Sequence, residues 1–463
     1  MISLILFVIV FLGFAVYLVY FQSFKSEKMA NSEYNPRTYA QKEDTIRGDI
    51  FDNKGNPIAY TDLDSEGKFQ RHYPKGEVDA NITGYFSEIY GVAGLESSYN
   101  KLLTGNIKES DNELTNRIQF DEDGSDLHLT LDQRIQDIAY NQTKDIVGSA
   151  VILDPKTGKV LAMTSQPSFN PNDVEKNWDK IVNMPNGPLV NRASAASYRP
   201  GSTMKIVSSG AVLKSGIDEN YNDTGSEIIK AEAQYNSGDF TITNYGNYRY
   251  GRINLASAFV NSVNTYYANK ATVMGRDFYA KNAKDFLFNV DYDFDLPNVG
   301  GKIPFNQLTH ADYAMTAFGY GMTEVSPLHM ALVASAVANN GVIMQPYLVE
   351  KVINRDGDVI RDRNPANLSQ ALDPVYAEYM KELMIDTVDN GFNEGAKVKD
   401  IVVAGKTGTV ENTKGTNEAW FVGFAPANNP QYVIAVVVED VEGTGGEYAS
   451  PVAGRILKEI FNK

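Results

Sequence analysis

The chain contains no cysteine among its 463 residues. This absence excludes disulfide bonds, thiolate nucleophiles and cysteine-based zinc sites. Histidine is scarce too, and no HExxH pair is present; the four histidines are His72, His128, His310 and His329. We therefore expect no metal and no cofactor, and a nucleophile in this chain has to be activated without an obvious imidazole partner.

Positive charge is also in short supply. Lysine and arginine number 42 against 58 aspartates and glutamates, which gives a formal net charge of −16. A protein that binds the phosphate backbone of a nucleic acid needs a basic surface, so nucleic-acid partners are excluded. The hydrophobic fraction of 43% and the charged fraction of 22% are typical of a globular protein, and the length suits two or three domains.

One long hydrophobic run is present, at the N-terminus. Residues Ile2–Phe21 carry no charge over 20 positions, enough for a helix to cross a hydrocarbon core about 30 Å thick. A cleaved signal peptide is the alternative, but it has a shorter apolar core and a small-residue cleavage site, which Gln22–Lys28 does not offer. We expect residues 1–22 to be an uncleaved transmembrane anchor. Lys25 and Lys28 follow the span, which by the positive-inside rule favours an orientation with the rest of the chain inside. Large domains cross membranes largely regardless of such charges, so the orientation is not assigned from charge.

A polar segment and then a region of short elements follow the anchor. The segment from Ser23 to about Lys42 predicts a tether. Beyond it, the patterns predict a hairpin at 47–60, a loop and helix at 85–105, and a strand followed by a helix with Asp132 as its cap at 127–141. We expect residues 23–145 to form a smaller, non-catalytic α+β domain.

The region 146–463 has strand patterns at both ends and helical patterns between them. Strands are predicted in hairpins at 149–164 and 347–361 and singly at 401–409, 418–424 and 432–441. Helices are predicted at 202–215, 255–273, 327–338 and near 453–461. This order indicates an α+β fold: an antiparallel sheet flanked by helices and closed by both ends of the region, with a helical subdomain alongside.

A serine and a lysine stand three residues apart where one of these helices begins. The segment Arg199–Ser209 (RPGSTMKIVSS) places Ser202 in the first turn and Lys205 on the same face of the helix. The helix N-terminus favours developing negative charge, and a lysine whose pKa is lowered by burial or by another cation can accept the serine proton. For this pattern alone, the alternative is a helix cap beside a surface lysine.

Two further groups supply what such a pair needs. Ser262 and Asn264 lie in Asn261–Thr265, which is poor helix material inside a helical stretch and predicts a connecting turn. The run Lys406–Thr409 (KTGT) follows the apolar segment Ile401–Ala404. A cation, two hydroxyls and open backbone amides at a strand edge can hold a carboxylate and an oxyanion.

In this order, and about 60 and about 140 residues apart, serine–x–x–lysine, serine–x–asparagine and lysine–threonine–glycine resemble the signature of penicillin-binding proteins and serine β-lactamases. The segments 150–171, 318–328 and 419–426 resemble further parts of that family's transpeptidase domain. Residues 84–103 resemble the end of the non-catalytic domain of its class B members. The resemblance covers about residues 45–463 and implies a penicillin-binding transpeptidase fold at 146–463, preceded by a pedestal or dimerisation-like domain at 23–145.

The resemblance also implies a function, that of a monofunctional peptidoglycan D,D-transpeptidase working through an acyl-enzyme. Ser202 would attack a D-Ala-D-Ala stem peptide, Lys205 would accept its proton, and Ser262 would relay a proton to the leaving group. Substrate binding would fall to Asn264, Lys406, Thr407, Gly408 and Thr409, and the oxyanion hole to the backbone amides of Ser202 and Thr409. β-Lactams, which mimic D-Ala-D-Ala, would acylate Ser202 and stay bound.

The motifs leave alternatives. A D,D-carboxypeptidase differs only in using water in place of an amine, which the motifs do not specify. A β-lactamase of class A needs a deacylating glutamate, and the nearest string, Glu350–Asn354, lies in a predicted hairpin. A β-lactam sensor or a wall-assembly scaffold fits less well, because no segment suits a cytoplasmic signalling region and a scaffold does not need the three motifs.

Location and partners follow from the resemblance and the predicted anchor. We expect a single-pass protein of the cell membrane with its catalytic domain on the extracytoplasmic face, serving cell-wall synthesis and cell shape. Class B members typically work beside a separate polytopic glycosyltransferase, so we expect such a partner from the elongation or division machinery. Elongation, division and sporulation are equally open at this point.

Overall fold

The computed structural model describes residues 2–25, 46–65, 67–105, 123–230 and 238–462. A helix, α1 (Ile2–Phe24), covers the predicted anchor. Among the residues that are described in full, no helix is both long and apolar enough to cross a membrane, so the anchor stays a prediction. Most of the predicted tether lies outside the described residues.

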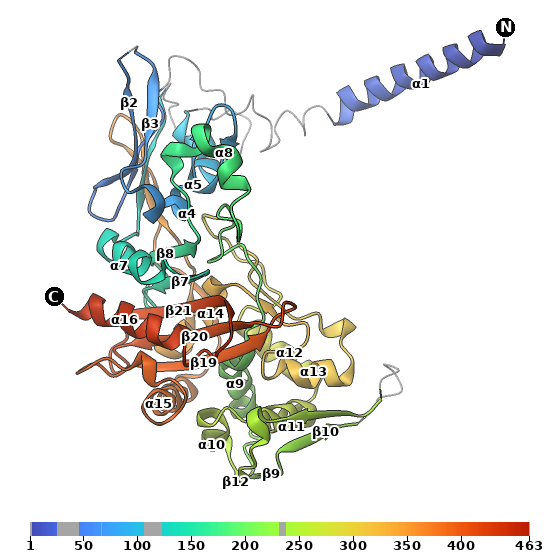
Figure 1. The fold of residues 1–463 in the computed structure, drawn as a ribbon, viewed down its shortest axis with the longest axis vertical. Helices are drawn as coiled ribbons and strands as arrows, with labels where there is room; N and C mark the ends of the chain where they lie inside the picture. Colours follow the sequence, from blue (N-terminus) through green and yellow to red (C-terminus); the bar gives the residue numbers. More distant parts are fainter. Residues whose placement is uncertain (1, 26–45, 66, 106–122, 231–237, 463) are drawn as a thin grey trace.

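The N-terminal domain, which contains β2 and β3 at the top of Figure 1, is organised around a six-stranded sheet with the order β17-β16-β6-β1-β2-β3. Its strands are β1 (Ile50–Phe51), β2 (Pro57–Leu63), β3 (Phe69–His72), β6 (Asp126–Leu129), β16 (Val349–Ile353) and β17 (Val359–Asp362). The hairpin expected at 47–60 is the antiparallel pair β1–β2. The hairpin expected at 347–361 is β16–β17, but β16 also pairs with β6. Two strands from the distant half of the chain therefore complete this sheet.

A buried ion-pair cluster holds the short helices of this domain against the sheet. The helices are α4 (Ala80–Thr83), α5 (Gly94–Ser98) and α6 (Asn100–Leu103), beside the small pair β4 (Phe86–Ser87) and β5 (Gly91–Val92). Glu96 on α5 is fully buried and accepts hydrogen bonds from Arg47 at 2.5 Å, Arg71 at 2.7 Å and the Tyr73 hydroxyl at 3.1 Å. Two guanidinium groups around one carboxylate satisfy a charge that would otherwise be costly to bury.

The second domain is built on a five-stranded antiparallel sheet with the order β19-β20-β21-β7-β8. The strands are β7 (Gly148–Leu153), β8 (Val160–Gln166), β19 (Ala404–Glu411), β20 (Asn417–Ala425) and β21 (Tyr432–Val441). Strands from the two ends of the region thus lie side by side, as the sequence predicted. Their residues are almost entirely buried, and alternate positions belong to two different hydrophobic cores, one on each face.

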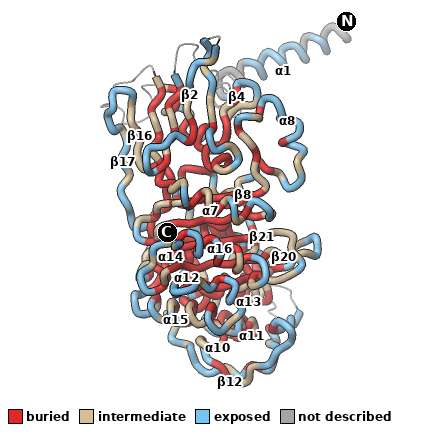
Figure 2. Tube along the Cα trace, turned by 60° about the vertical axis from the view of Figure 1, so that its left-hand side comes forward, coloured by how far each residue is buried: buried red, intermediate tan, exposed pale blue. Residues whose placement is uncertain are grey.

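Helices cover both faces of this sheet (Figures 1 and 2). One face is packed by α14 (Pro327–Ala338), which is buried along its whole length. The other is packed by α7 (Gln133–Thr143) and α16 (Ala449–Phe461). The carboxylate of Asp132 caps α7 as predicted. Although α7 precedes residue 146, its buried residues join the core of the second domain's sheet.

The helical subdomain lies beyond the α14 face. Its helices are α9 (Lys205–Ser215), α10 (Leu255–Val260), α11 (Asn264–Met274), α12 (Arg276–Asp285), α13 (His310–Thr316) and α15 (Pro374–Asn390). The helix expected over 202–215 begins at Lys205, after a 3₁₀ turn at Gly201–Met204. The stretch expected over 255–273 is split at residues 261–263, where the connecting turn was predicted.

Short elements complete the second domain. They are α8 (Val174–Val182) and the two-stranded pairs β9 (Tyr221–Asp223) with β12 (Gly251–Ile253), β10 (Ser226–Ile229) with β11 (Phe240–Thr243), β13 (Gly301–Lys302) with β14 (Glu324–Val325), and β15 (Val342–Met344) with β18 (Asn367–Gln370).

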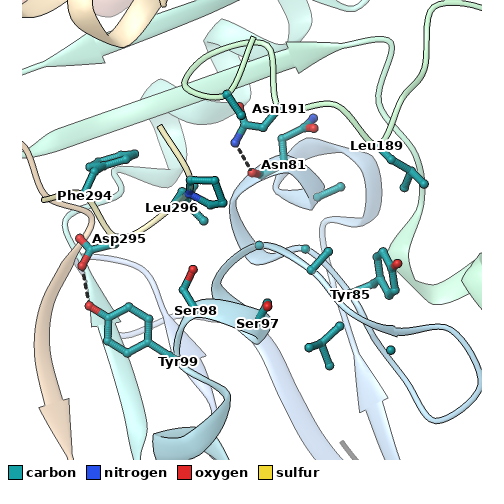
Figure 3. Close-up of a pocket in the computed structure, with 18 of the residues that line it drawn as sticks. Asn81, Tyr85, Ser97, Ser98, Tyr99, Leu189, Asn191, Phe294, Asp295 and Leu296 are labelled. Atoms are coloured by element: carbon teal, nitrogen blue, oxygen red, sulfur yellow. Dashed lines mark hydrogen bonds between the residues drawn. The ribbon is translucent and has the colours of Figure 1, made fainter. Parts of the chain in front are cut away.

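A cavity of about 1100 Å³ lies between the two domains (Figure 3). The Tyr99 hydroxyl donates to Asp295 at 2.5 Å on one side of it, and the Asn191 amide donates to the Asn81 carbonyl at 2.9 Å on another. None of the predicted site residues lines this cavity. These contacts join the domains away from the residues of the three sequence motifs.

Candidate active site

Ser202 stands on a tight turn that is pressed against the edge strand of the sheet. Gly201 has a φ of +53°, a conformation that glycine adopts easily, and its N–H donates to the Gly319 carbonyl at 3.1 Å. A side-chain carbon at Gly408 on β19 would lie 2.6 Å from the Pro200 carbonyl oxygen. Close approach at these glycines places the Ser202 turn directly on β19.

Lys205 lies one helical turn further on and is completely buried. Its Nζ is 3.0 Å from Ser202 Oγ, 3.0 Å from Ser262 Oγ, 2.7 Å from the Ser262 carbonyl oxygen and 2.8 Å from Asn264 Oδ1. An ammonium has only three N–H bonds and cannot serve four acceptors at once. Burial, reinforced by the positive charge of Lys406, holds the pKa of Lys205 well below its usual range. A neutral Lys205 can accept a proton from Ser202.

Ser262 occupies the break between α10 and α11. Its φ of +55° is unusual for a residue other than glycine, and this conformation points the side chain at the two lysines. Ser262 Oγ accepts from Lys205 at 3.0 Å and from Lys406 at 3.1 Å. With both acceptor positions of the hydroxyl occupied, its own proton is available to another group.

Lys406 reaches the site from β19 and is 1% exposed. Burial lowers the pKa of Lys406 to about 7. Its Nζ also donates to the Thr407 carbonyl at 3.4 Å and lies 5.9 Å from the centre of the Phe259 ring. Two buried lysines that face one serine hydroxyl favour loss of a proton from the pair.

The predicted substrate-binding residues divide into two groups. Thr409 Oγ1 accepts a hydrogen bond from the Gly445 amide at 3.0 Å, so its hydroxyl proton is free to bind a carboxylate. Thr407 instead donates its hydroxyl to Asn393 Oδ1 at 2.5 Å and is largely buried. The hydroxyl proton of Thr409 is therefore available to a ligand, whereas that of Thr407 is not. Asn264 bridges Lys205 and the Thr243 carbonyl, which its amide reaches at 3.2 Å.

The free edge of β19 faces the nucleophile. The Thr409 carbonyl accepts from the Tyr320 hydroxyl at 3.2 Å, and Tyr320 lies outside the sheet. The N–H and C=O of one strand residue leave from the same edge, so the Thr409 amide points outward as well. This edge can supply one donor for an oxyanion beside Ser202.

Three contact residues escaped the sequence analysis: Asn393, Gly445 and Tyr320. Asn393 holds Thr407 and donates to the Gly405 carbonyl at 3.2 Å, yet it comes from the loop after α15, which carries no pattern. Tyr320 lies in the glycine-rich segment 318–328 that resembled the family, but no contact was assigned to it. Within the described parts of the chain, no group of three or more histidines and carboxylates is placed to hold a metal ion.

Comparison with known proteins gives two family matches. Residues 148–462 match the penicillin-binding protein transpeptidase domain, and residues 47–124 match the penicillin-binding protein A dimerisation domain. The peptidoglycan D,D-transpeptidase PbpA of Mycolicibacterium smegmatis is 29% identical over 465 residues, covering 93% of this chain and 92% of that protein.

Solved structures agree with these matches. The D,D-transpeptidase domain of a peptidoglycan glycosyltransferase from Eggerthella lenta is 32% identical, with a TM-score of 0.79 over 90% of this chain and 98% of its own. Penicillin-binding protein A of Mycobacterium tuberculosis, in a ceftriaxone acyl-enzyme complex, is 27% identical, with a TM-score of 0.81 over 92% of this chain and 100% of its own.

Proposed function

The chain belongs to the class B penicillin-binding proteins, and on that premise we propose that it is a peptidoglycan D,D-transpeptidase inhibited covalently by β-lactams. It transfers the acyl group of a D-Ala-D-Ala stem peptide first to Ser202 and then to an amine of a neighbouring stem. One observation carries the proposal: Nζ of the fully buried Lys205 lies 3.0 Å from Ser202 Oγ. Burial and the nearby charge of Lys406 lower the pKa of Lys205, which favours its neutral form.

Acylation starts from neutral Lys205. Ser202 Oγ attacks the carbonyl carbon of the penultimate D-alanine as its proton moves to Lys205 Nζ. Negative charge collects on the carbonyl oxygen, for which the amides of Ser202 and Thr409 are the proposed donors. The preformed contact between serine and lysine means that little reorganisation precedes the attack.

Expulsion of the terminal D-alanine needs a proton on its nitrogen. Ser262 Oγ donates its proton to that nitrogen as the C–N bond breaks, and Lys205 passes the proton that it took from Ser202 on to Ser262 Oγ, 3.0 Å away. Lys406 keeps Ser262 oriented through the 3.1 Å contact. The acceptor amine then attacks the acyl carbon, and its proton travels back through Ser262 and Lys205 to Ser202 Oγ.

Substrate binding is assigned to the residues around this relay. Thr409 binds the terminal carboxylate with its free hydroxyl proton, and Asn264 binds the substrate amide. Gly408 keeps β19 close to the nucleophile turn. Thr407 acts through its neighbours, because its hydroxyl is already donated to Asn393.

Location and partner are further parts of the proposal. The uncharged run Ile2–Phe21 supports an N-terminal membrane anchor, with the catalytic domain on the extracytoplasmic face. The family supports a polytopic glycosyltransferase partner and a role in cell-wall growth and cell shape, with residues 23–145 as the pedestal. Membrane fractionation, followed by identification of the partner that co-purifies with the full chain, tests both points.

The catalytic proposal is tested by labelling with a fluorescent penicillin and by cross-linking of uncross-linked peptidoglycan. We expect the wild-type chain to be labelled and to form cross-links, and Ser202→Ala to do neither. Ser215→Ala, at the C-terminal end of α9, is the matched control and should behave as wild type. Equal labelling of Ser202→Ala would refute the assignment, and release of D-alanine without cross-links would identify a carboxypeptidase.

A further inference from the structure

Beside the catalytic motifs, a turn of the chain exposes several aromatic and basic side chains. The turn covers residues 243–250 (TNYGNYRY), and we call it the tyrosine turn. Tyr245 is 74% exposed and Tyr248 is 61% exposed, and Arg249 between Tyr248 and Tyr250 is exposed too. Aromatic rings that are exposed together on a surface are typical of interaction sites, whereas single exposed rings are not.

The tyrosine turn is fastened to the catalytic helix α11. The Asn264 side chain touches Lys205 with its oxygen at 2.8 Å and donates to the Thr243 carbonyl with its nitrogen at 3.2 Å. The next residue, Thr265, donates its backbone N–H to Asn244 Oδ1 at 3.1 Å. The side-chain amide of Asn264 therefore connects the start of the turn to Lys205, the proposed base.

A buried carboxylate fixes the shape of the tyrosine turn. Asp223 is 2% exposed and accepts from the Tyr250 amide at 2.7 Å, from Asn244 Nδ2 at 3.0 Å and from Thr265 Oγ1 at 2.7 Å. One carboxylate thus joins the start of the turn, its end and the helix that carries Asn264. A satisfied buried network of this kind holds a loop in one conformation.

Two glycines serve as platforms for the exposed side chains. A side-chain carbon at Gly246, whose φ is +62°, would lie 2.7 Å from Cε2 of the Tyr248 ring. A side-chain carbon at Gly225 would lie 2.8 Å from Cγ of Arg249. Tyr248 and Arg249 therefore pack against the backbone of these glycines on one side and are exposed to solvent on the other. A ligand that stacks on them binds side chains that are already ordered.

Charge at the turn points to an anionic ligand. The protein carries a net charge of −16, yet Arg249 and Arg252 are both exposed here. Neither arginine has an ion-pair partner within the described part of the chain. Free guanidinium groups bind carboxylates, whereas tyrosine rings stack on the apolar C–H faces of sugar rings and hydrogen-bond through their hydroxyls.

We propose that the tyrosine turn binds the glycan strand of the substrate, with the sugar rings on Tyr245 and Tyr248 and the stem-peptide carboxylates at Arg249. This inference rests on the proposed function, because a stem peptide held at Ser202 and Asn264 brings its attached glycan to the side of the site on which the tyrosine turn lies. Carbohydrate is favoured over a protein partner, since the turn offers exposed ring faces and a guanidinium group beside the reaction centre.

The test measures glycan binding directly, in the full chain with Ser202→Ala to prevent turnover. The probe is a set of glycan strands from which an amidase has removed the stem peptides. We expect Tyr245→Ala with Tyr248→Ala to weaken binding at least about tenfold, the scale of losing two aromatic contacts. Phe278→Ala, which removes a partly exposed ring on α12, is the control and should bind as the parent does.

Kinetics on the wild-type background complete the test. The double tyrosine variant should raise KM for glycan-linked pentapeptide and leave kcat and the rate of penicillin acylation unchanged, which also shows that it is folded. A free pentapeptide should be used equally well by both proteins. Unchanged glycan binding, or an equal loss for free and glycan-linked peptide, would overturn the inference. Failure of penicillin to acylate the wild type would instead refute the proposed function.

Discussion

Replacing Lys406 by methionine should make the protein more stable and inactive at once. Burial lowers the pKa of Lys406 from 10.5 to about 7, which at 1.36 kcal/mol per unit costs the folded state about 5 kcal/mol. Methionine removes that cost but also removes the hydrogen bonds to Ser262 and to the Thr407 carbonyl, which contribute up to about 3 kcal/mol. We expect a net gain of about 2 kcal/mol at pH 7.

The pH dependence of this gain identifies its cause. The folded-state pKa lies below the unfolded value, so the cost of Lys406 is full below pH 7 and disappears as the pH rises from 7 to 10.5. Thermal unfolding should therefore show a Tm for Lys406→Met several degrees above wild type at pH 7 and no higher at pH 10.5. Lys302→Met, at an exposed lysine on β13, should not show this pattern.

Activity is the other half of the prediction. Without Lys406, Ser262 loses one of its two donors and Lys205 loses the neighbouring charge that lowers its pKa. Acylation by penicillin at pH 7 should fall by at least about a hundredfold, the scale of losing one general-acid–base contribution. A variant that is less stable than wild type at pH 7, or that acylates normally, would refute this account of the buried pair.

Three shorter predictions follow. Lys205→Arg should slow penicillin acylation at least about a thousandfold, because guanidinium does not deprotonate; near-normal labelling kinetics would remove Lys205 as the base. Gly408→Ala should slow acylation in a folded protein, because its side chain would meet the Pro200 carbonyl oxygen at 2.6 Å, and an unchanged rate would show that the nucleophile turn tolerates displacement. Burial lowers the pKa of His329 from 6.5 to about 3, so the stability that neutral His329 provides is lost as the pH falls below 6.5; His329→Leu should flatten thermal stability between pH 6.5 and 4, and an unaltered profile would contradict this.

That Ser202, Lys205, Ser262 and Lys406 lie together could be predicted, because each belongs to a short motif with its own chemistry. Ser202 and Lys205 stand three residues apart in one motif, and the sequence around Ser262, which disfavours a helix, predicted the break between α10 and α11 in which Ser262 lies. The local backbone was harder. Ser202 stands on a 3₁₀ turn and not in the first turn of α9, since the contact of Gly201 and Gly408 with their neighbours overrides the helix pattern.

Contacts between distant segments were beyond the sequence. Asn393, in a loop without any motif, accepts the hydrogen bond of the Thr407 hydroxyl. Because of this contact, Thr409 and not Thr407 has a hydroxyl proton available for a carboxylate. The β16–β17 hairpin was predicted, but its pairing with β6 joins residues more than 200 positions apart in the sequence. Tertiary pairing of this kind leaves no local pattern.

Peptide mapping by mass spectrometry after treatment with penicillin tests the central claim most directly. The wild-type protein should carry one acyl adduct, on Ser202 within the peptide that contains the Ser202–Lys205 motif, at full occupancy. An unmodified protein, or an adduct on any other residue, would contradict the account of Ser202 as the nucleophile and of the three motifs as one active site.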